Sequence, residues 1–516
     1  MKKPAVIAES KLPSGTPANG LARRSLGALK WNYLGAVVRM LSQLVIGIVL
    51  ARQLGPEPFG LIAIASLIIG LGNLVADTGL GVALIQREQV SPRDVRYVFT
   101  LQLLAGLTLA LLAVFAAPLI AAFFGRADAA PVLRWMSLIF VFQAIGQTAS
   151  ALLRRDLNHK RLQILQIVSY LAGYLLVGMP LAFSGQGVWA LVSAQLAQSA
   201  INAIAVYMST RHPLMPVFSA DQSGLFKFGS KVLASNLTSW GISNLDSAII
   251  GRMLGVVNLG IYNRSMNLIA SPMNAVVSTL QGVLLPLYSR LQSRAEAVRD
   301  TYLASICVMS VVLAPAFAAV AAMPETTILA VYGQEWRAAI VLITPLALAM
   351  PVNAVLAMGG PMMLGMGRAG MDAASQAIGV VVMVLAVIVA SRFSLLAVAW
   401  VVLAVYLLRA WLVTHVAAGL IAVPARALFR ALIGPLMLAA LAGLLAWQAD
   451  YWFAVVAPQP GLRFVLVLFA VALIVLLAIM MWGRWIFCPE AKNIMLNARP
   501  HLDPRLGNLM MCWSVA

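Results

Sequence analysis

Residues 52–60 read RQLGPEPFG, and residues 252–260 read RMLGVVNLG. Both stretches contain the pattern Arg-x-Leu-Gly-x-x-x-x-Gly, and each position of the second copy follows its counterpart by 200 residues. Each copy lies between two long apolar runs. A motif that recurs at one offset between apolar runs indicates that the chain consists of two related halves, each built from membrane-spanning helices.

The composition places the whole chain in a membrane. Of its 516 residues, 62% are hydrophobic and 10% are charged, whereas a soluble domain is about half apolar and about a quarter charged. Apolar runs of about 20 residues, the length that crosses a bilayer, recur along the sequence and predict about fourteen helices. One of these helices is expected at residues 228–251.

Basic residues predict the orientation of the helices. The net charge is +19. The basic residues lie in short loops beside apolar runs, so membrane topology and binding to lipid headgroups explain the charge better than nucleic-acid binding does. The loops after even-numbered helices are the richer ones, holding Arg87, Arg93, Arg96, Arg154, Arg155, Lys160, Arg161, Arg290, Arg294 and Arg299. The positive-inside rule therefore predicts that both termini lie in the cytoplasm.

The position of the two motifs predicts the domain organisation. An even number of expected helices separates them, so the repeats are parallel rather than inverted. We expect an all-α protein with two lobes of about six helices each, at residues 31–225 and 226–421. Residues 1–30 are expected to be a disordered basic tail, residues 422–485 two extra helices, and residues 486–516 a cytoplasmic segment.

The second helix of each half carries polar residues at intervals of three or four, which places them on one helical face. The bland interpretation of the small residues among them is interhelical packing, since Ser, Gly and Asn commonly lie between membrane helices. The functional interpretation is a hydrated cavity between the lobes. The two faces are Ser66, Gly70, Asn73, Asp77 and Gly81, and Arg264, Asn267, Ser271, Asn274, Ser278 and Gln281.

Charged residues inside the expected helices are stronger candidates for a substrate cavity. A charge at a helix centre costs about 2.5–3.5 kcal/mol, so it marks a functional site by default. We place Arg39, Lys231 and Asp246 in the cavity with Arg264 and the polar faces. A buried ion pair between Asp246 and Arg252 or Arg264 would account for some of these charges without a ligand. Arg409 and His415 are weaker candidates.

Motifs for covalent chemistry are absent from the sequence. No Gly-x-x-x-x-Gly-Lys-Ser/Thr loop occurs, which argues against an ATP motor. The four histidines form no metal-ligand spacing, and no nucleophile has a base nearby in the sequence. We therefore expect a transporter with no cofactor rather than an enzyme, with Na⁺ or H⁺ left open as a coupling ion.

Two stretches resemble bacterial polysaccharide exporters of the colanic-acid type. The first is DTGLGVALIQR at residues 77–87, and the second runs from Asp246 through Arg252 and Gly260 to Arg264. Exporters of this type are Wzx-type lipid-linked oligosaccharide flippases, in the superfamily that also holds multidrug-and-toxin extruders and the lipid II flippase. The likeness covers roughly residues 30–420, and the last hundred residues match in hydropathy alone.

The resemblance implies alternating access through a cationic cavity and passage of an undecaprenyl-diphosphate-linked sugar unit to the periplasmic leaflet of a bacterial inner membrane. It also implies coupling to a polysaccharide polymerase and an export machine. Arg39, Lys231 and Arg264 suit the phosphates of such a substrate by chemistry. The leading rival is an ion-coupled drug antiporter of the multidrug type. A membrane polymerase or ligase is a further rival, but would carry a large periplasmic loop that this sequence lacks.

Overall fold

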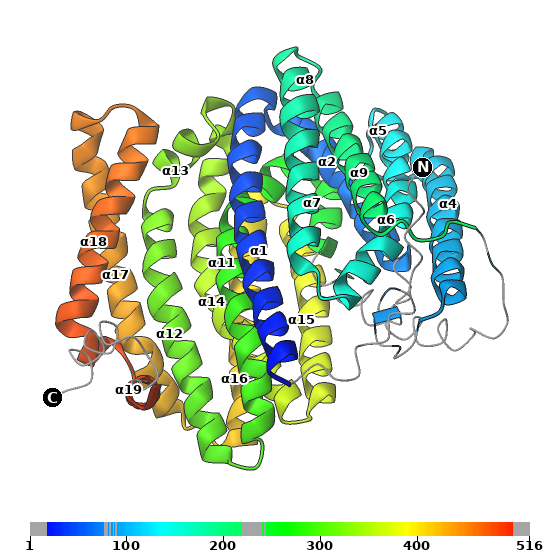
Figure 1. Ribbon diagram of the computed structural model, residues 1–516. Coiled ribbons are helices and arrows are strands. Elements are labelled where there is room, and N and C mark those ends of the chain that lie inside the picture. Colours follow the sequence, from blue (N-terminus) through cyan, green and yellow to red (C-terminus); the bar gives the residue numbers. More distant parts are fainter. Residues whose placement is uncertain are drawn as a thin grey trace. The chain divides into compact units, whose positions relative to one another are not determined.

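The computed structural model describes residues 18–76, 81, 84, 85, 87, 90–215, 217, 240, 241 and 244–498. Every regular element among them is a helix (Figure 1). Thirteen of these helices are long and apolar enough to span a membrane. They match thirteen of the expected helices, while the one expected at residues 228–251 lies largely outside the described residues. The chain is an all-helical, multi-pass membrane protein.

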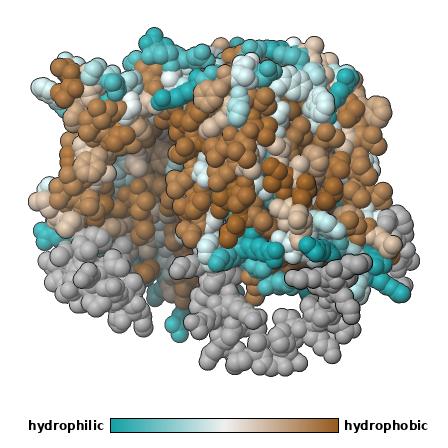
Figure 2. Space-filling view, turned by 45° about the horizontal axis from the view of Figure 1, so that its top comes forward, coloured by the Kyte–Doolittle hydropathy of each residue, from teal (hydrophilic) through white to brown (hydrophobic). Residues whose placement is uncertain are grey.

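The surfaces of the helices suit a bilayer. Hydrophobic residues cover the middle of the helices, and hydrophilic residues gather toward their ends (Figure 2). Large apolar side chains such as Phe115 and Val455 are 77% and 83% exposed. In a soluble protein such a surface would aggregate, but in a bilayer it is solvated by acyl chains.

The chain forms two compact units, Met1–Gly260 and Ile261–Ala516. In the first unit, α6 packs on both α4 and α9, and α1 packs on α7. The helices of this unit are α1 (Ala18–Leu54), α2 (Pro56–Ala76), α4 (Pro92–Phe123), α5 (Ala129–Met136), α6 (Leu138–Arg155), α7 (His159–Leu171), the π-helix η1 (Ala172–Gly178), α8 (Met179–Phe183) and α9 (Val188–Thr210).

The second unit is organised around one central helix. Its helix α12 makes large interfaces with α14 and α17 and lies between them in Figure 1. The elements are α11 (Val256–Leu291), which begins in the first unit, α12 (Ala295–Ala322), α13 (Pro324–Val331), the 3-10 helix η3 (Gln334–Ala339), α14 (Ile340–Gly365), α15 (Ala369–Ala390), α16 (Leu395–Ile421), α17 (Ala425–Val456), α18 (Pro460–Ile486) and α19 (Pro489–Ala498).

The two last membrane helices, α17 and α18, are integral to the second unit. Ala319 of α12 and Met323, which follows the last residue of α12, form a buried cluster with Ala442, Ala446 and Val467. At the end of this cluster Arg463 donates to both carboxylate oxygens of Asp450, at 2.6 and 2.7 Å. Thr326 of α13 donates to the same carboxylate at 2.7 Å. The extra helices are thus bound by both packing and charge.

Several boundaries differ from those expected from sequence. Helix α1 begins at Ala18, inside the range expected to be a disordered tail. Helix α19 lies in the expected C-terminal segment and packs on α12. The units divide at Gly260, whereas the lobes were placed on either side of residue 225. The two units are defined by contacts within the chain, whereas the two lobes are defined by the repeated motif. The lobe boundaries therefore stay a prediction.

The repeated motif is a sharp helix-to-helix turn in both copies. Gly55 and Gly255 have φ of +68° and +89°, a left-handed conformation that favours glycine. The Gly55 amide donates to the Ala51 carbonyl at 3.2 Å, and the Leu254 amide donates to the Ile250 carbonyl at 2.8 Å. The first glycine of each copy therefore ends one helix and lets the next begin at once.

The second glycines of the two copies meet inside the first unit. A Cβ added to Gly60 would lie 2.0 Å from the Val256 carbonyl oxygen, and one added to Gly260 would lie 2.2 Å from the Pro56 carbonyl oxygen. Val256 follows Pro56 by the same 200 residues that separate the glycines. The backbone of each copy thus packs directly against the second glycine of the other copy. The first glycine of the motif is needed for the left-handed turn, and the second is needed for this close contact.

Candidate functional site

Arg39 is held by the neighbouring helix α7. Its Nη1 donates to Oε1 of Gln166 at 2.7 Å, and its side chain is half-buried. One turn earlier, α1 approaches α7 so closely that a Cβ on Gly35 would lie 2.7 Å from Gln163. A neutral amide orients the guanidinium without cancelling its charge, which leaves the cation able to bind an anion.

Asn73 lies on the polar face of α2. Its Oδ1 is buried and has no hydrogen-bond partner within the described part of the chain. One turn earlier, a Cβ on Gly70 would lie 2.8 Å from Nε1 of Trp240. The close contact places Trp240 against α2, one helical turn from Asn73. A buried amide oxygen without a donor is costly, so this position suits a ligand hydroxyl or a water molecule.

The remaining candidates of the first unit are only partly described. Asp246 is half-buried in the helical residues 244–253, and its Oδ1 accepts from the Ser247 amide at 2.7 Å. Asp77 and Lys231, both expected in the cavity, lie outside the described residues. The contribution of these two side chains stays a prediction.

A polar face runs along α11 in the second unit. Asn267, Asn274 and Ser278 are exposed although α11 spans the membrane. Between them, Ser271 donates to the Asn267 carbonyl at 2.6 Å, and further along Nε2 of Gln281 donates to the Ala357 carbonyl at 2.7 Å. Amides exposed on a spanning helix need water, protein or a polar ligand opposite them.

Aromatic rings accompany two of the arginines. The Arg264 guanidinium lies 5.6 Å from the centre of the Tyr332 ring, and the Tyr332 hydroxyl donates to the Arg264 carbonyl at 3.2 Å. The Arg252 guanidinium lies 5.3 Å from the centre of the Phe123 ring. Arg252 thus lies against the end of α4, beside the repeated turn. The ring below Arg264 fixes a guanidinium at the start of the α11 polar face.

The chemistry offered in each unit is recognition rather than catalysis. Arg39 and Asn73 in the first unit, and Arg264, Asn267 and Asn274 in the second, supply cations and amides. Within the described residues, no group of three or more His, Cys, Asp or Glu side chains could hold a metal ion. Guanidinium groups pair with phosphates, and amides pair with sugar hydroxyls.

Sequence reasoning missed the partners that orient these side chains. Gln166, Trp240 and Tyr332 were not singled out, although each contacts a candidate residue or its neighbour on the helix. A weak signal existed for α7, where Gln163 and Gln166 lie three residues apart in an apolar helix and so share a face. Trp240 and Tyr332 carried no such signal, because single aromatic residues are common in membrane proteins.

Solved structures share this fold. The inward closed lipid II flippase MurJ aligns over 85% of this chain and 98% of its own, with a TM-score of 0.65 at 12% identity. An inward-facing multidrug resistance MATE family transporter of the MOP superfamily aligns over 75% of this chain and 98% of its own, with a TM-score of 0.59 at 15% identity. At these identities the likeness establishes the fold and nothing finer.

Comparison of sequences identifies the family to which the chain belongs. The teichuronic acid biosynthesis protein TuaB of Bacillus subtilis is 26% identical over 73% of this chain and 78% of its own length. The succinoglycan biosynthesis transport protein ExoT of Rhizobium meliloti is 28% identical over 62% and 65%. The lipopolysaccharide biosynthesis protein WzxC of Escherichia coli is 23% identical over 66% and 69%. The model of the polysaccharide biosynthesis protein family matches residues 49–341, more than half of the chain, so the chain belongs to that family.

Proposed function

We propose that this protein is a flippase that carries undecaprenyl-diphosphate-linked oligosaccharide units from the cytoplasmic to the periplasmic leaflet of a bacterial inner membrane. The observation that carries the proposal is the polar face of α11, where Asn267, Asn274 and Ser278 are exposed on a membrane-spanning helix. Arg39 and Arg264 add cations suited to a diphosphate. Relatives named for succinoglycan transport and lipopolysaccharide biosynthesis support the same substrate class.

The proposed cycle is alternating access. The charged headgroup crosses along polar faces while its polyprenyl tail stays in the lipid, because hydroxyls and phosphates are costly to place in hydrocarbon. A gradient of Na⁺ or H⁺ is the proposed energy source. A polymerase and an export complex are the proposed partners that receive the unit in the periplasm.

Transport in vesicles tests the proposal. We expect vesicles with the purified protein to expose inner-leaflet lipid-linked oligosaccharide to an impermeant glycosidase, so that the cleaved fraction exceeds that in protein-free vesicles. The control is a phosphatidylcholine with a fluorescent headgroup, whose accessibility should not change. An unchanged cleaved fraction would contradict the flippase, and efflux of cationic dyes instead would favour the multidrug antiporter.

Cysteine labelling tests the predicted orientation. Gln53 and Met253 occupy equivalent exposed positions in the two copies of the motif, 200 residues apart. In a chain whose native cysteines are replaced by serine, Gln53→Cys and Met253→Cys should both react in intact cells with a thiol reagent that cannot cross the inner membrane. Labelling of one position from each side of the membrane would refute parallel repeats, and labelling of both from the cytoplasm would refute the assigned orientation.

A further inference from the structure

Arg409 is a charged residue that the proposed cavity does not use. It lies near the middle of α16, a helix that spans the membrane from Leu395 to Ile421. A guanidinium at this depth is costly in hydrocarbon and marks a functional position by default. Within the described part of the chain no carboxylate lies within ion-pair distance of Arg409, since the ion pairs recorded there involve Arg87, Arg126, Arg299 and Arg463.

Two residues of helix α15 hold this guanidinium in place. Nη2 of Arg409 donates to Oε1 of Gln376 at 2.6 Å. A Cβ on Gly379 would lie 2.3 Å from Nε of Arg409, so the missing side chain makes the room that the guanidinium fills. A neutral amide and a glycine hold the group in place and leave its charge uncompensated. This is the arrangement expected of a site that receives an anion.

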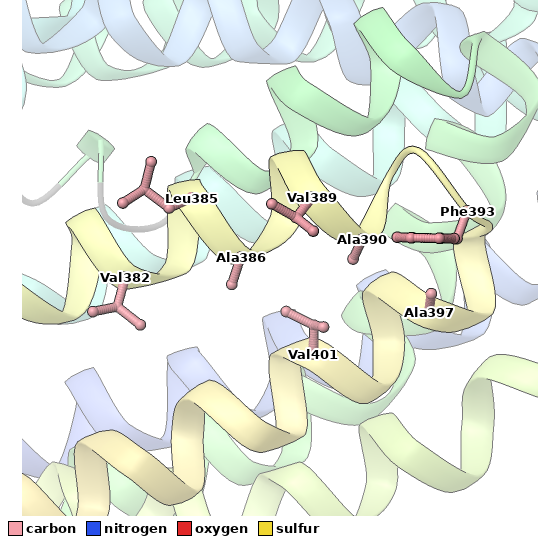
Figure 3. Close-up of a pocket in the computed structure, with 8 residues that line it drawn as sticks. All are labelled: Val382, Leu385, Ala386, Val389, Ala390, Phe393, Ala397 and Val401. Carbon is pink, nitrogen blue, oxygen red and sulfur yellow. The ribbon is translucent and has the colours of Figure 1, made fainter.

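An apolar groove lies next to this guanidinium, along α15 and α16. It is lined by Val382, Leu385, Ala386 and Val389 of α15, by Ala397 and Val401 of α16 and by Phe393 at the connection (Figure 3), and its volume is about 570 Å³. Val382 follows Gly379 by one helical turn, so the groove begins next to the guanidinium. Leu385 and Val389 are 59% and 58% exposed at membrane depth, which opens the groove to hydrocarbon.

We propose that Arg409 and this groove bind the lipid part of the substrate, an isoprenoid diphosphate, with the diphosphate on Arg409 and the adjoining isoprene units in the groove. The assignment rests on the proposed flippase function and adds a second contact, on α15 and α16. The occupant must combine a negative charge with a hydrocarbon chain. Phosphates of ordinary phospholipids stay at the bilayer surface, whereas a translocated lipid carries its phosphates to the depth of Arg409.

Direct binding tests the site. The full chain in phosphatidylcholine nanodiscs is titrated with radiolabelled geranylgeranyl diphosphate. Arg409→Gln should weaken binding about tenfold or more, because a charge-assisted contact is lost. Ala386→Phe should weaken it comparably by filling the groove, yet leave the weaker binding of inorganic diphosphate unchanged. Matched controls are Arg392→Gln in the exposed connection and Val381→Phe on the exposed face of α15.

Crosslinking gives a second measurement, in which Arg409 is not substituted. A benzoylphenylalanine at Leu385 should crosslink geranylgeranyl diphosphate, and one at Phe469 of α18, which is 69% exposed, should not. Competition by phosphatidylglycerol as strong as by geranylgeranyl diphosphate would overturn the proposal in favour of an ordinary lipid site. Equal labelling at both positions, or wild-type affinity of Arg409→Gln, would overturn it as well.

The outcomes separate this site from the flippase function. If the wild-type chain flips lipid-linked oligosaccharide while Arg409→Gln and Ala386→Phe bind geranylgeranyl diphosphate normally, the site is wrong and the function stands. If the wild-type chain does not flip the substrate but the two variants lose binding, the function is wrong and an isoprenoid diphosphate site remains.

Discussion

Arg39→Ala should abolish polymer export in cells while the protein remains abundant in the membrane. The guanidinium is half-buried within a spanning helix and is oriented by Gln166. Its removal eliminates a cation that we assign to the substrate diphosphate, and a charge-assisted contact of this kind has no nearby replacement on α1. Export is measured as surface polysaccharide per cell, and abundance by quantitative blotting of membranes.

The companion variants separate binding from packing. Gln166→Leu removes the hydrogen bond that ties α1 to α7 but keeps the charge of Arg39, so export should fall only slightly. Arg39→Lys keeps the charge and loses the fork geometry, so export should be intermediate. If Gln166→Leu stops export as completely as Arg39→Ala, Arg39 acts by holding α7 and the substrate contact is wrong.

Gly60→Val should lower the thermal stability of the protein and stop export. The new Cβ would lie 2.0 Å from the Val256 carbonyl oxygen, which is backbone and cannot rotate away. Overpacking of a tight contact costs about 1–3 kcal/mol, and here a helix must shift to relieve it. Gly260→Val should act in the same way, because its Cβ would meet the Pro56 carbonyl. The measurement is the unfolding temperature in detergent.

Gly461→Val is the matched control for this pair. Gly461 lies in the first turn of α18, and a Cβ there would have no heavy atom within 4 Å. The same substitution should therefore leave stability and export close to those of the wild-type chain. A normal unfolding temperature for both Gly60→Val and Gly260→Val would show that the two copies of the motif do not rest on each other.

The repeated motif shows how far sequence reasoning reached. Each copy lies between two apolar runs, which predicts a connection between two helices, and positive φ at Gly55 and Gly255 shows that the connection is a sharp turn. The role of Gly60 and Gly260 was not predicted, because an offset in sequence says nothing about distance in space. Helix positions were predicted well, since long apolar runs are a strong signal. The start of α1 was missed because Ala18 and its neighbours are not apolar enough to read as a span.

The candidate site was predicted in part. Periodicity placed Asn267, Asn274 and Ser278 on one face of a helix, and all three are exposed there. Periodicity cannot say what lies opposite a side chain, so the tie between Arg39 and Gln166 was not foreseen. The same limit applies to Arg409, a weaker candidate from the sequence, because its contact with a glycine on another helix cannot be read from the sequence. Partners of this kind are fixed by packing, not by local sequence.

The position of α12 between α14 and α17 has a consequence for the order of assembly. Helix α12 ends at Ala322 and α17 begins at Ala425, so about a hundred residues are synthesised between them. During that time the face of α12 that receives Ala442 and Ala446 has only lipid or the insertion machinery against it. The second unit can therefore mature only after its last helices have been inserted, and a ribosome stalled before residue 425 would leave an unfinished protein in the membrane.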